Sequence, residues 1–441
     1  MRFDGSNYMA MALAQALLSV GVSRPNPAVG AVVVKDGIVV GRGRTQRPGN
    51  AHAEVMALRD AGELARGAAI YVTLEPCCHY GRTPPCTKAI IEAGISKVFY
   101  AHADPNPVVR GNSRKILEDA GIQVHEGKEA CIAAEFEDLE ECGNGECRCL
   151  AGMEVAPPLG LNVATSGVAD QGAVLNGQPF ANSGLLEHSS DGETVFRYVE
   201  RFYEAYDHFV RTKRTFVEIK SALTQEGAVA ARGDQGDVLP IRITGDGANC
   251  WNHELRAMSD AVLVSSRTVL VDDPGLDVRL ASGNNPVKVI LAGHHEFSTD
   301  EVARLKIFNS EPSGIYSPSI ILFSIVPQPH VSEHADAGPL CGHLEMVQLP
   351  SENFAENWEF VISSLSGRGM HRLMVEPGAT LAGNIFEAGL WNRLDLWRSM
   401  NSRIDDCLDG VSLDYPEMPE NMVAGESAMV GPDILTVYYP S

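Results

Sequence analysis

Two short stretches decide the fold of the first part of the chain: His52-Ala53-Glu54 and Pro76-Cys77-Cys78-His79-Tyr80-Gly81-Arg82-Thr83-Pro84-Pro85-Cys86. One imidazole and two thiolates are typical ligands of a catalytic zinc ion, whose fourth tetrahedral position stays open for water. The metal lowers the pKa of that water and makes hydroxide available near neutral pH. Glu54 can face the water without ligating the metal, and it can pass the water proton to a departing amine. The sequence therefore predicts a catalytic zinc site with His52, Cys77 and Cys86 as ligands and Glu54 as proton shuttle.

Other interpretations of these residues stay open at this point. A His-x-Glu triplet is common in helices, and two separated cysteines can be buried thiols without a metal. A closed structural zinc site needs a fourth protein ligand, which Cys78 or His79 could supply. Next to a ligand, Cys78 is more often a packed thiol. The strand-helix context of the whole set favours the catalytic site.

Strands and helices alternate around the two stretches. The patterns predict helices over 7–19, from Asn50 as N-cap through 61, from Pro84-Pro85 to Gly94, and near 110–120. They predict strands over 28–34, 38–43, 68–74, 96–101 and 122–125. This alternation predicts an α/β/α sandwich on a largely parallel sheet. Both thiolates then lie at the start of a helix, where the helix dipole favours their anionic form.

The rest of the chain divides into an irregular segment and a second α/β region. Residues 141–195 contain many Gly and Ser, Pro157-Pro158 and the cluster Cys142, Cys147 and Cys149, without a sustained period. Such a segment is typical of an insertion or linker, and its cysteines lack an evident fourth ligand for a second metal. A helix is expected near 195–209, followed by strands at 215–222, 261–264 and 287–291. We therefore predict domains over 1–140 and 196–441, joined by 141–195.

Composition and charge exclude several classes of function. The 441 residues include 35 Lys+Arg and 57 Asp+Glu, which gives a net charge of −22. A nucleic acid held by electrostatics would find little to bind, so no nucleic-acid partner is expected. No apolar run approaches the ~20 residues that span a bilayer, and the N-terminus does not resemble a signal peptide. The sequence predicts a cytoplasmic enzyme without a membrane or nucleic-acid partner.

The first domain resembles the deaminase half of the bifunctional riboflavin-biosynthesis deaminase/reductases of the RibD type. The resemblance runs from Tyr8 to about Gly127, and its specific motifs are Pro25-Asn26-Pro27-Ala28-Val29-Gly30, His52-Ala53-Glu54, Tyr71-Val72-Thr73-Leu74-Glu75-Pro76-Cys77, Gly81-Arg82-Thr83-Pro84-Pro85-Cys86 and Asp104-Pro105-Asn106-Pro107. It implies a cytidine-deaminase-like α/β/α sandwich with one Zn²⁺ per chain. It also implies that Asn26, His79 and Arg82 contact a pyrimidine nucleotide. Without the family, Asn26 would be read as a turn residue and Arg82 as a surface charge.

Two features of this half differ from related patterns. The Cys77–Cys86 spacing is longer than the PCxxC of cytidine, tRNA-adenosine and nucleic-acid deaminases. The RibD type usually has a histidine at position 45, where this chain has Thr45 after Arg44. We expect either an altered grip on the substrate there or compensation by Arg44.

The second domain resembles the reductase half of the same family, a dihydrofolate-reductase-like α/β domain that uses NADPH. The most specific motifs are Leu255-Arg256-Ala257-Met258-Ser259-Asp260-Ala261, residues 268–279, Val375-Glu376-Pro377-Gly378-Ala379-Thr380-Leu381-Ala382-Gly383 and Val430-Gly431-Pro432-Asp433. The resemblance implies a substrate-binding set of Lys220, Arg256, Leu276, Arg279 and Glu376. It implies a cofactor-binding set of Leu223, Arg242, Thr268, Asp272 and the 378–384 turn, which is Gly378, Ala379, Thr380, Leu381, Ala382, Gly383 and Asn384. Two arginines suit a ribose phosphate, and the glycines let backbone amides approach a pyrophosphate.

This half departs from the family pattern more than the first. Arg242 stands where the family has tryptophan, and Pro240 stands where it has serine. The family interpretation predicts a homo-oligomeric bifunctional enzyme that deaminates 2,5-diamino-6-ribosylamino-4(3H)-pyrimidinone 5′-phosphate and then reduces the ribosyl to a ribityl chain. The alternatives are a monofunctional deaminase with a degenerate reductase-like half and a nucleic-acid deaminase. The net charge and the cysteine spacing count against the latter.

Overall fold

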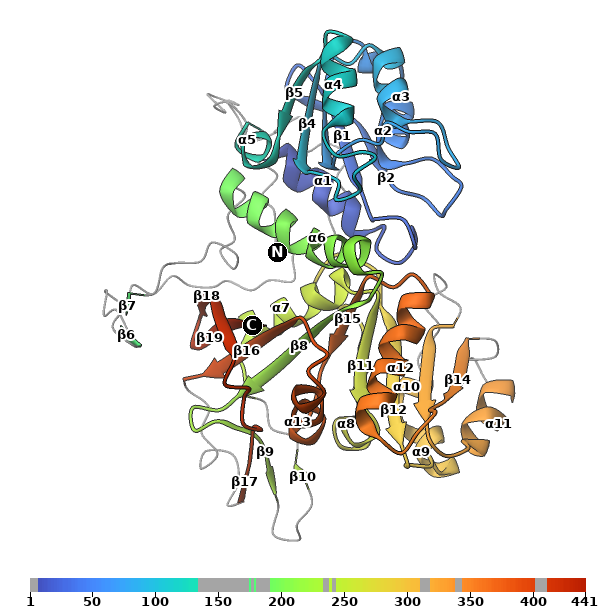
Figure 1. Ribbon diagram of the computed structural model, residues 1–441, viewed down its shortest axis with the longest axis vertical. Coiled ribbons are helices and arrows are strands. Elements are labelled where there is room, and N and C mark those ends of the chain that lie inside the picture. Colours follow the sequence, from blue (N-terminus) through green and yellow to red (C-terminus); the bar gives the residue numbers. More distant parts are fainter. Residues whose placement is uncertain are drawn as a thin grey trace, which may run out of the picture.

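The computed structural model describes residues 7–133, 174–175, 178–179, 191–232, 238–239, 243–309, 318–337, 343–400 and 411–441. Two α/β units lie one above the other in Figure 1, with the long helix α6 (Gly192–Thr212) between them. The predicted boundary between residues 195 and 196 falls inside this helix. Most of the predicted 141–195 segment, with its cysteine cluster, and Pro240 and Arg242 lie outside the described residues.

The first unit is built on a five-stranded sheet with the order β2-β1-β3-β4-β5. Strands β3, β4 and β5 are parallel, but β1 pairs antiparallel with both β2 and β3. The expectation of a largely parallel sheet is therefore wrong for β1, because both of its pairings are antiparallel. The strands are β1 (Gly30–Lys35), β2 (Ile38–Arg44), β3 (Ala69–Leu74), β4 (Lys97–His102) and β5 (Gln123–Glu126).

Helices cover both faces of this sheet, as predicted. Helices α1 and α5 pack on one face, and α2, α3 and α4 follow one another on the other. Helix α2 can approach β2 closely because Gly41 and Gly43 have no side chains: a Cβ on Gly43 would lie 2.1 Å from the Ala53 carbonyl oxygen. The helices are α1 (Tyr8–Leu17), α2 (Ala53–Ala61), the short 3₁₀ helix η1 (Gly62–Ala65), α3 (Cys86–Ala93), α4 (Asn112–Asp119) and α5 (Gly127–Ile132).

The second unit contains a nine-stranded sheet with the order β14-β13-β12-β11-β15-β8-β16-β19-β18. The strands from β14 to β16 are parallel, and β19 and β18 add antiparallel pairs at one edge. Its strands are β8 (Phe216–Leu223), β11 (Ala261–Ser265), β12 (Val287–Gly293), β13 (Ile320–Ser324), β14 (Leu344–Gln348), β15 (Arg372–Val375), β16 (Arg393–Ser399), β18 (Met422–Val430) and β19 (Asp433–Pro440).

Seven helices of the described part and a small sheet accompany the large one. The helices are α7 (Asp246–Met258), α8 (Ser266–Asp272), α9 (Thr299–Arg304), α10 (Lys306–Asn309), α11 (Pro329–Ala337), α12 (Phe354–Gly367) and α13 (Ala379–Ala388). The small sheet has the order β10-β9-β17, with β9 (Ala228–Arg232), β10 (Val238–Leu239) and β17 (Val411–Asp414). A separate two-stranded sheet pairs β6 (Val174–Leu175) antiparallel with β7 (Gln178–Pro179).

One hydrophobic core runs from the first unit through α6 to one face of the large sheet. It includes Leu13 and Val72 of the first unit, Tyr198 and Tyr203 of α6, and Val262 of the second unit. A second cluster covers the other face of the large sheet with α12 and α13. Helix α6 is therefore an integral part of both units. Among the described residues, no helix combines the length and the apolar character that crossing a membrane requires.

Candidate active sites

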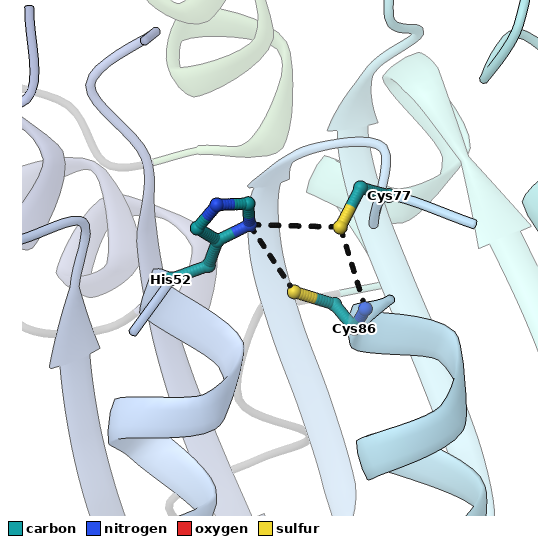
Figure 2. A group of neighbouring side chains, drawn as sticks. All are labelled: His52, Cys77 and Cys86. Atoms are coloured by element: carbon teal, nitrogen blue, oxygen red, sulfur yellow. Dashed lines mark hydrogen bonds between the residues drawn. The ribbon is translucent and has the colours of Figure 1, made fainter. Parts of the chain in front are cut away.

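The predicted zinc ligands converge between the starts of α2 and α3. Nδ1 of His52 lies 3.5 Å from Sγ of Cys77 and 3.5 Å from Sγ of Cys86 (Figure 2). Ligand atoms of a tetrahedral zinc site, with Zn–N of about 2.0 Å and Zn–S of about 2.3 Å, lie about 3.6 Å apart. The three donors therefore have the chemistry and the separations that zinc requires.

Local structure explains why the two cysteines meet. Cys86 is the first residue of α3, and its backbone N–H donates to Sγ of Cys77 at 3.3 Å. This arrangement confirms that a helix start faces the thiolates. The hydrogen bond with the Cys86 side chain, more than the one from its backbone, lowers the pKa of Cys77 to about 4 despite burial, and the hydrogen bond to Cys77 raises the pKa of His52 to about 8. The site thus favours thiolate over thiol at Cys77.

Glu54 is buried beside this cluster, in the first turn of α2. His52 is the N-cap residue of the helix, so the predicted cap at Asn50 is wrong: the Asn50 amide donates to the Arg47 carbonyl oxygen instead. Glu54 is 3% exposed, and burial raises its pKa to about 7. A carboxyl group in this environment is suited to accept and release a proton.

The geometry does not support a closed structural zinc site. Sγ of Cys78 points to the Val108 carbonyl oxygen, at 3.5 Å, and His79 is exposed. Within the described ranges, the group of close metal-ligating side chains consists of His52, Cys77 and Cys86 alone. Three protein ligands leave one tetrahedral position for water or substrate, as in catalytic sites.

The predicted nucleotide-binding residues lie on two loops. His79 and Arg82 are exposed on the loop between Cys77 and Cys86. Asn26 is half-buried in a turn where its N–H donates to the Ser23 carbonyl oxygen. The exposed pair is available to an anionic group from solvent. Their roles in binding stay predictions.

The unusual position 45 belongs to the same region as Asn26. Thr45 is buried, its N–H donates to the Val29 carbonyl oxygen, and its hydroxyl accepts from the Val29 N–H. Arg44 is exposed. Thr45 therefore joins the segment after Asn26 to the stretch that leads to His52.

In the second unit, three predicted substrate-binding residues meet where the parallel strands end. Arg256 of α7 forms a two-pronged ion pair with Glu376, with Nε–Oε1 at 2.7 Å and Nη2–Oε2 at 2.9 Å. Lys220 of β8 is close enough to interact electrostatically with both, and burial lowers its pKa. Glu376 directly follows β15, between β8 and β11, where the direction of strand connection reverses. Such switch points commonly bind ligands in α/β sheets.

Leu276 and Arg279 lie on the loop after α8. Leu276 is 1% exposed and has a positive φ of 54°. The side chain of Arg279 is 61% exposed and has a distant ion pair with Asp277, at 3.9 Å. The Arg279 guanidinium is therefore available to a phosphate, whereas the Leu276 side chain packs in the core.

The predicted cofactor residues have varied environments. Leu223 is buried at the end of β8, Thr268 bonds to Ser265 at the start of α8, and Asp272 has its pKa raised by burial. The predicted turn 378–384 is wrong beyond Gly378, since α13 begins at Ala379. Leu381 and Ala382 are buried, whereas a Cβ on Gly378 would meet open space. Only the backbone amides at the start of α13 are suited to a pyrophosphate.

Two residues near the sites were missed by sequence reasoning. Thr83 lies within the quoted motif, and its hydroxyl is 3.4 Å from Nε2 of His52, where it can orient the imidazole. Asn252 of α7 is 7% exposed and bonds to Glu376, while its Oδ1 has no hydrogen-bond partner within the described residues. The spacing of Asn252 from Arg256 carries no motif, so no signal in the sequence points to Asn252.

The fold and the two sites define a zinc-dependent deaminase unit joined to a reductase unit of the dihydrofolate-reductase type. Residues 4–102 match the family described as the cytidine and deoxycytidylate deaminase zinc-binding region, and residues 215–397 match the RibD C-terminal domain. The chain is 30% identical to the riboflavin biosynthesis protein RibD of Haemophilus influenzae over 403 residues, covering 88% of this chain and 84% of that protein. The chain belongs to the RibD family and is a bifunctional deaminase and reductase of riboflavin biosynthesis.

Other relatives agree with this assignment. The riboflavin biosynthesis protein RibD of Aquifex aeolicus is 34% identical over 317 residues, which cover 72% of this chain and 67% of that protein. A solved diaminohydroxyphosphoribosylaminopyrimidine deaminase/5-amino-6-(5-phosphoribosylamino)uracil reductase from Thermotoga maritima superposes with a TM-score of 0.60 at 26% identity, covering 98% of each chain. RibD of Acinetobacter baumannii has the same fold, with a TM-score of 0.60 at 23% identity.

Proposed function

We propose that the chain converts 2,5-diamino-6-ribosylamino-4(3H)-pyrimidinone 5′-phosphate in two steps, first by hydrolytic deamination and then by reduction of the ribosyl to the ribityl chain. The observation that carries the first step is the convergence of His52, Cys77 and Cys86 beside the buried Glu54. The named activity of the Thermotoga maritima relative supports the substrate.

In the deamination, His52, Cys77 and Cys86 would hold one zinc ion per chain. A bound zinc ion supplies a Lewis acid that makes water nucleophilic near neutral pH. Glu54 takes a proton from the attacking water and returns it to the departing amine, so that water and substrate give the pyrimidinedione and ammonia. Asn26 presents an amide that suits the pyrimidine edge, and the exposed His79 and Arg82 suit the 5′-phosphate.

In the reduction, Lys220, Arg256 and Glu376 support a site at the carboxyl ends of β8 and β15. A bound NADPH would supply a hydride to the ribose C1, and the ring oxygen would take a proton from water as the ring opens. The open backbone at Gly378, with Leu223, Thr268, Asp272 and the start of α13, would bind the cofactor. The exposed Arg279 would bind the substrate phosphate. Arg242 is kept in the proposed cofactor set from the sequence alone.

Product analysis with the purified protein tests both steps. With the diaminopyrimidinone nucleotide alone, we expect release of ammonia, and with NADPH we expect the ribityl product as well. Arg279→Ala should weaken binding of the phosphorylated substrate by about 1.5–3 kcal/mol with little change in NADPH affinity. Deamination without any NADPH binding would favour the monofunctional alternative, and absence of ammonia release would refute the proposal. Cell fractionation and gel filtration test the predicted cytoplasmic homo-oligomer.

A further inference from the structure

The segment that carries Asn26 is held from the reductase half along its length. Nδ2 of Asn284 donates to the carbonyl oxygens of Leu18 and Val20, at 3.0 and 3.1 Å. Nε2 of His371 lies 3.1 Å from the Pro25 carbonyl oxygen. Both contacts come from loops of the reductase half and are made to backbone carbonyl groups. They therefore constrain the backbone path of the segment independently of its side chains.

Tyr203 of α6 adds a continuous chain of hydrogen bonds to the same segment. The Gly30 N–H donates to the Thr73 hydroxyl at 3.1 Å, and the Thr73 and Tyr203 hydroxyls lie 2.6 Å apart. The Tyr203 hydroxyl in turn donates to the Ala28 carbonyl oxygen at 2.9 Å. Because that hydroxyl donates to Ala28, it accepts from Thr73. Thr73 and Tyr203 are 0% and 1% exposed, so water does not easily replace these bonds.

Shape and charge complete the contact around the same segment. Gly369 has a φ of 69°, and a Cβ there would lie 2.8 Å from Cβ and 3.3 Å from Cα of Pro25, so the absence of a side chain at Gly369 lets the two segments lie this close. Nε of Arg24 lies 3.7 Å from Oδ1 of Asp260. Oδ2 of Asp260 accepts from the His371 N–H at 2.8 Å, which fixes the loop that bears His371. The reductase surface is therefore itself ordered where it meets the segment.

We propose that Tyr203 of α6 and Asn284 and His371 of the reductase half are positioning residues for deamination, and that the reductase half thereby orders part of the deaminase substrate site. The three residues act through the Asn26 segment, which Thr45 connects to the stretch leading to His52. The inference rests on the proposed contact of Asn26 with the pyrimidine. The zinc ligands and Glu54 make none of these bonds, so the effect falls on substrate binding.

The test compares Tyr203→Phe and Asn284→Ala with the wild-type full-length protein. In both variants we expect the KM for deamination to rise about 2- to 10-fold, the effect of losing a neutral hydrogen bond, with kcat and zinc content unchanged. Reduction of separately supplied deaminated nucleotide should keep its wild-type rate. Tyr206→Phe is the matched control. Tyr206 lies in the same helix as Tyr203 and packs on His371, but its hydroxyl makes no hydrogen bond within the described residues.

Hydrogen–deuterium exchange gives a second readout that does not depend on activity. We expect faster exchange of the backbone amides of residues 19–30 in Tyr203→Phe and Asn284→Ala, with β4 unchanged. Unchanged KM and unchanged exchange in both variants would overturn the inference, as would a loss of kcat together with zinc. If the wild-type protein does not deaminate, the proposed function fails, and exchange alone decides whether the reductase half orders the segment.

Discussion

Replacing Gly43 by alanine tests how α2 positions the zinc site. A Cβ at Gly43 would lie 2.1 Å from the Ala53 carbonyl oxygen, 2.3 Å from the Ala57 N and 2.9 Å from Cβ of Met56. Two of these three atoms belong to backbone, which cannot rotate away. Since ordinary contact begins at 3.4 Å, α2 has to move away from β2 by about 1 Å or more.

This displacement reaches the metal ligands directly. His52 caps α2, and its carbonyl oxygen accepts from the Met56 N–H at 3.0 Å, so the ligand moves with the first turn. Overpacking of this kind costs about 1–3 kcal/mol of stability. A misplacement of about 1 Å lowers catalytic efficiency by about 100-fold. We therefore expect Gly43→Ala to lose zinc, stability and most deamination together.

Metal analysis per chain, thermal unfolding and initial rates of ammonia release measure the three effects. Gly367→Ala is the control, since a Cβ at Gly367 meets no atom within 4 Å at the end of α12. The control should keep its zinc and its activity, and its stability should be equal or slightly higher. A Gly43→Ala protein with full zinc, wild-type stability and wild-type rates would refute the reasoning.

Three further predictions concern the proton shuttle, α6 and the segment before it. Glu54→Gln should keep zinc but lower the kcat of ammonia release by about 10²–10⁴-fold in initial-rate assays, because an amide cannot shuttle the proton. Burial lowers the pKa of His102, but hydrogen bonds to Asp207 and Glu200 outweigh it and raise the pKa from 6.5 to about 9, so the stability from its charged form is complete below pH 6.5 and lost as the pH rises through 9. Over this pH window, thermal unfolding should show the wild type losing about 1–2 kcal/mol more stability than His102→Gln. The loss is smaller than the full pKa shift implies, because solvent screens the exposed carboxylate of Glu200. Replacing residues 142–190 by a short Gly/Ser linker should leave zinc content and deamination nearly unchanged, because loop closure costs only about 0.6 kcal/mol per doubling of loop length. Loss of folding in this variant would contradict the prediction that the segment is only a linker.

The zinc cluster could be predicted from sequence because its geometry is local to two strand–helix turns. The helices that begin at Ala53 and Cys86 are the next elements after β2 and β3. Because β2 and β3 run in the same direction, both helices begin at the same edge of the sheet. The direction of β3 could not be predicted from the alternation of elements. β1 pairs antiparallel with both β2 and β3 and lies between them, so β3 runs parallel to β2 without pairing with it.

The reductase site was harder to predict because its parts come from distant stretches. From the sequence alone, Arg256 is compatible with an ordinary surface helix and Glu376 with an ordinary strand end. Their ion pair forms only once the fold brings the two residues together. The Gly378-Ala379-Thr380-Leu381-Ala382-Gly383 stretch reads as a glycine-rich turn, yet Leu381 and Ala382 bury an apolar side and make it helical. The local composition of this stretch does not reveal the tertiary packing that makes it helical.

Helix α6 is where the sequence was least informative, because its polar residues are buried by partners far along the chain. Arg201 forms ion pairs with Glu218 of β8 and with Asp395 of β16, the latter at 2.6 Å, and all three are at most 4% exposed. Unpaired charges in the interior are very unfavourable, so α6 is stable on this sheet only in the orientation that pairs Arg201. That orientation directs Tyr203 to the opposite side, against Thr73 of the deaminase half. The same buried charges that attach α6 to the reductase sheet therefore determine where the deaminase segment is held.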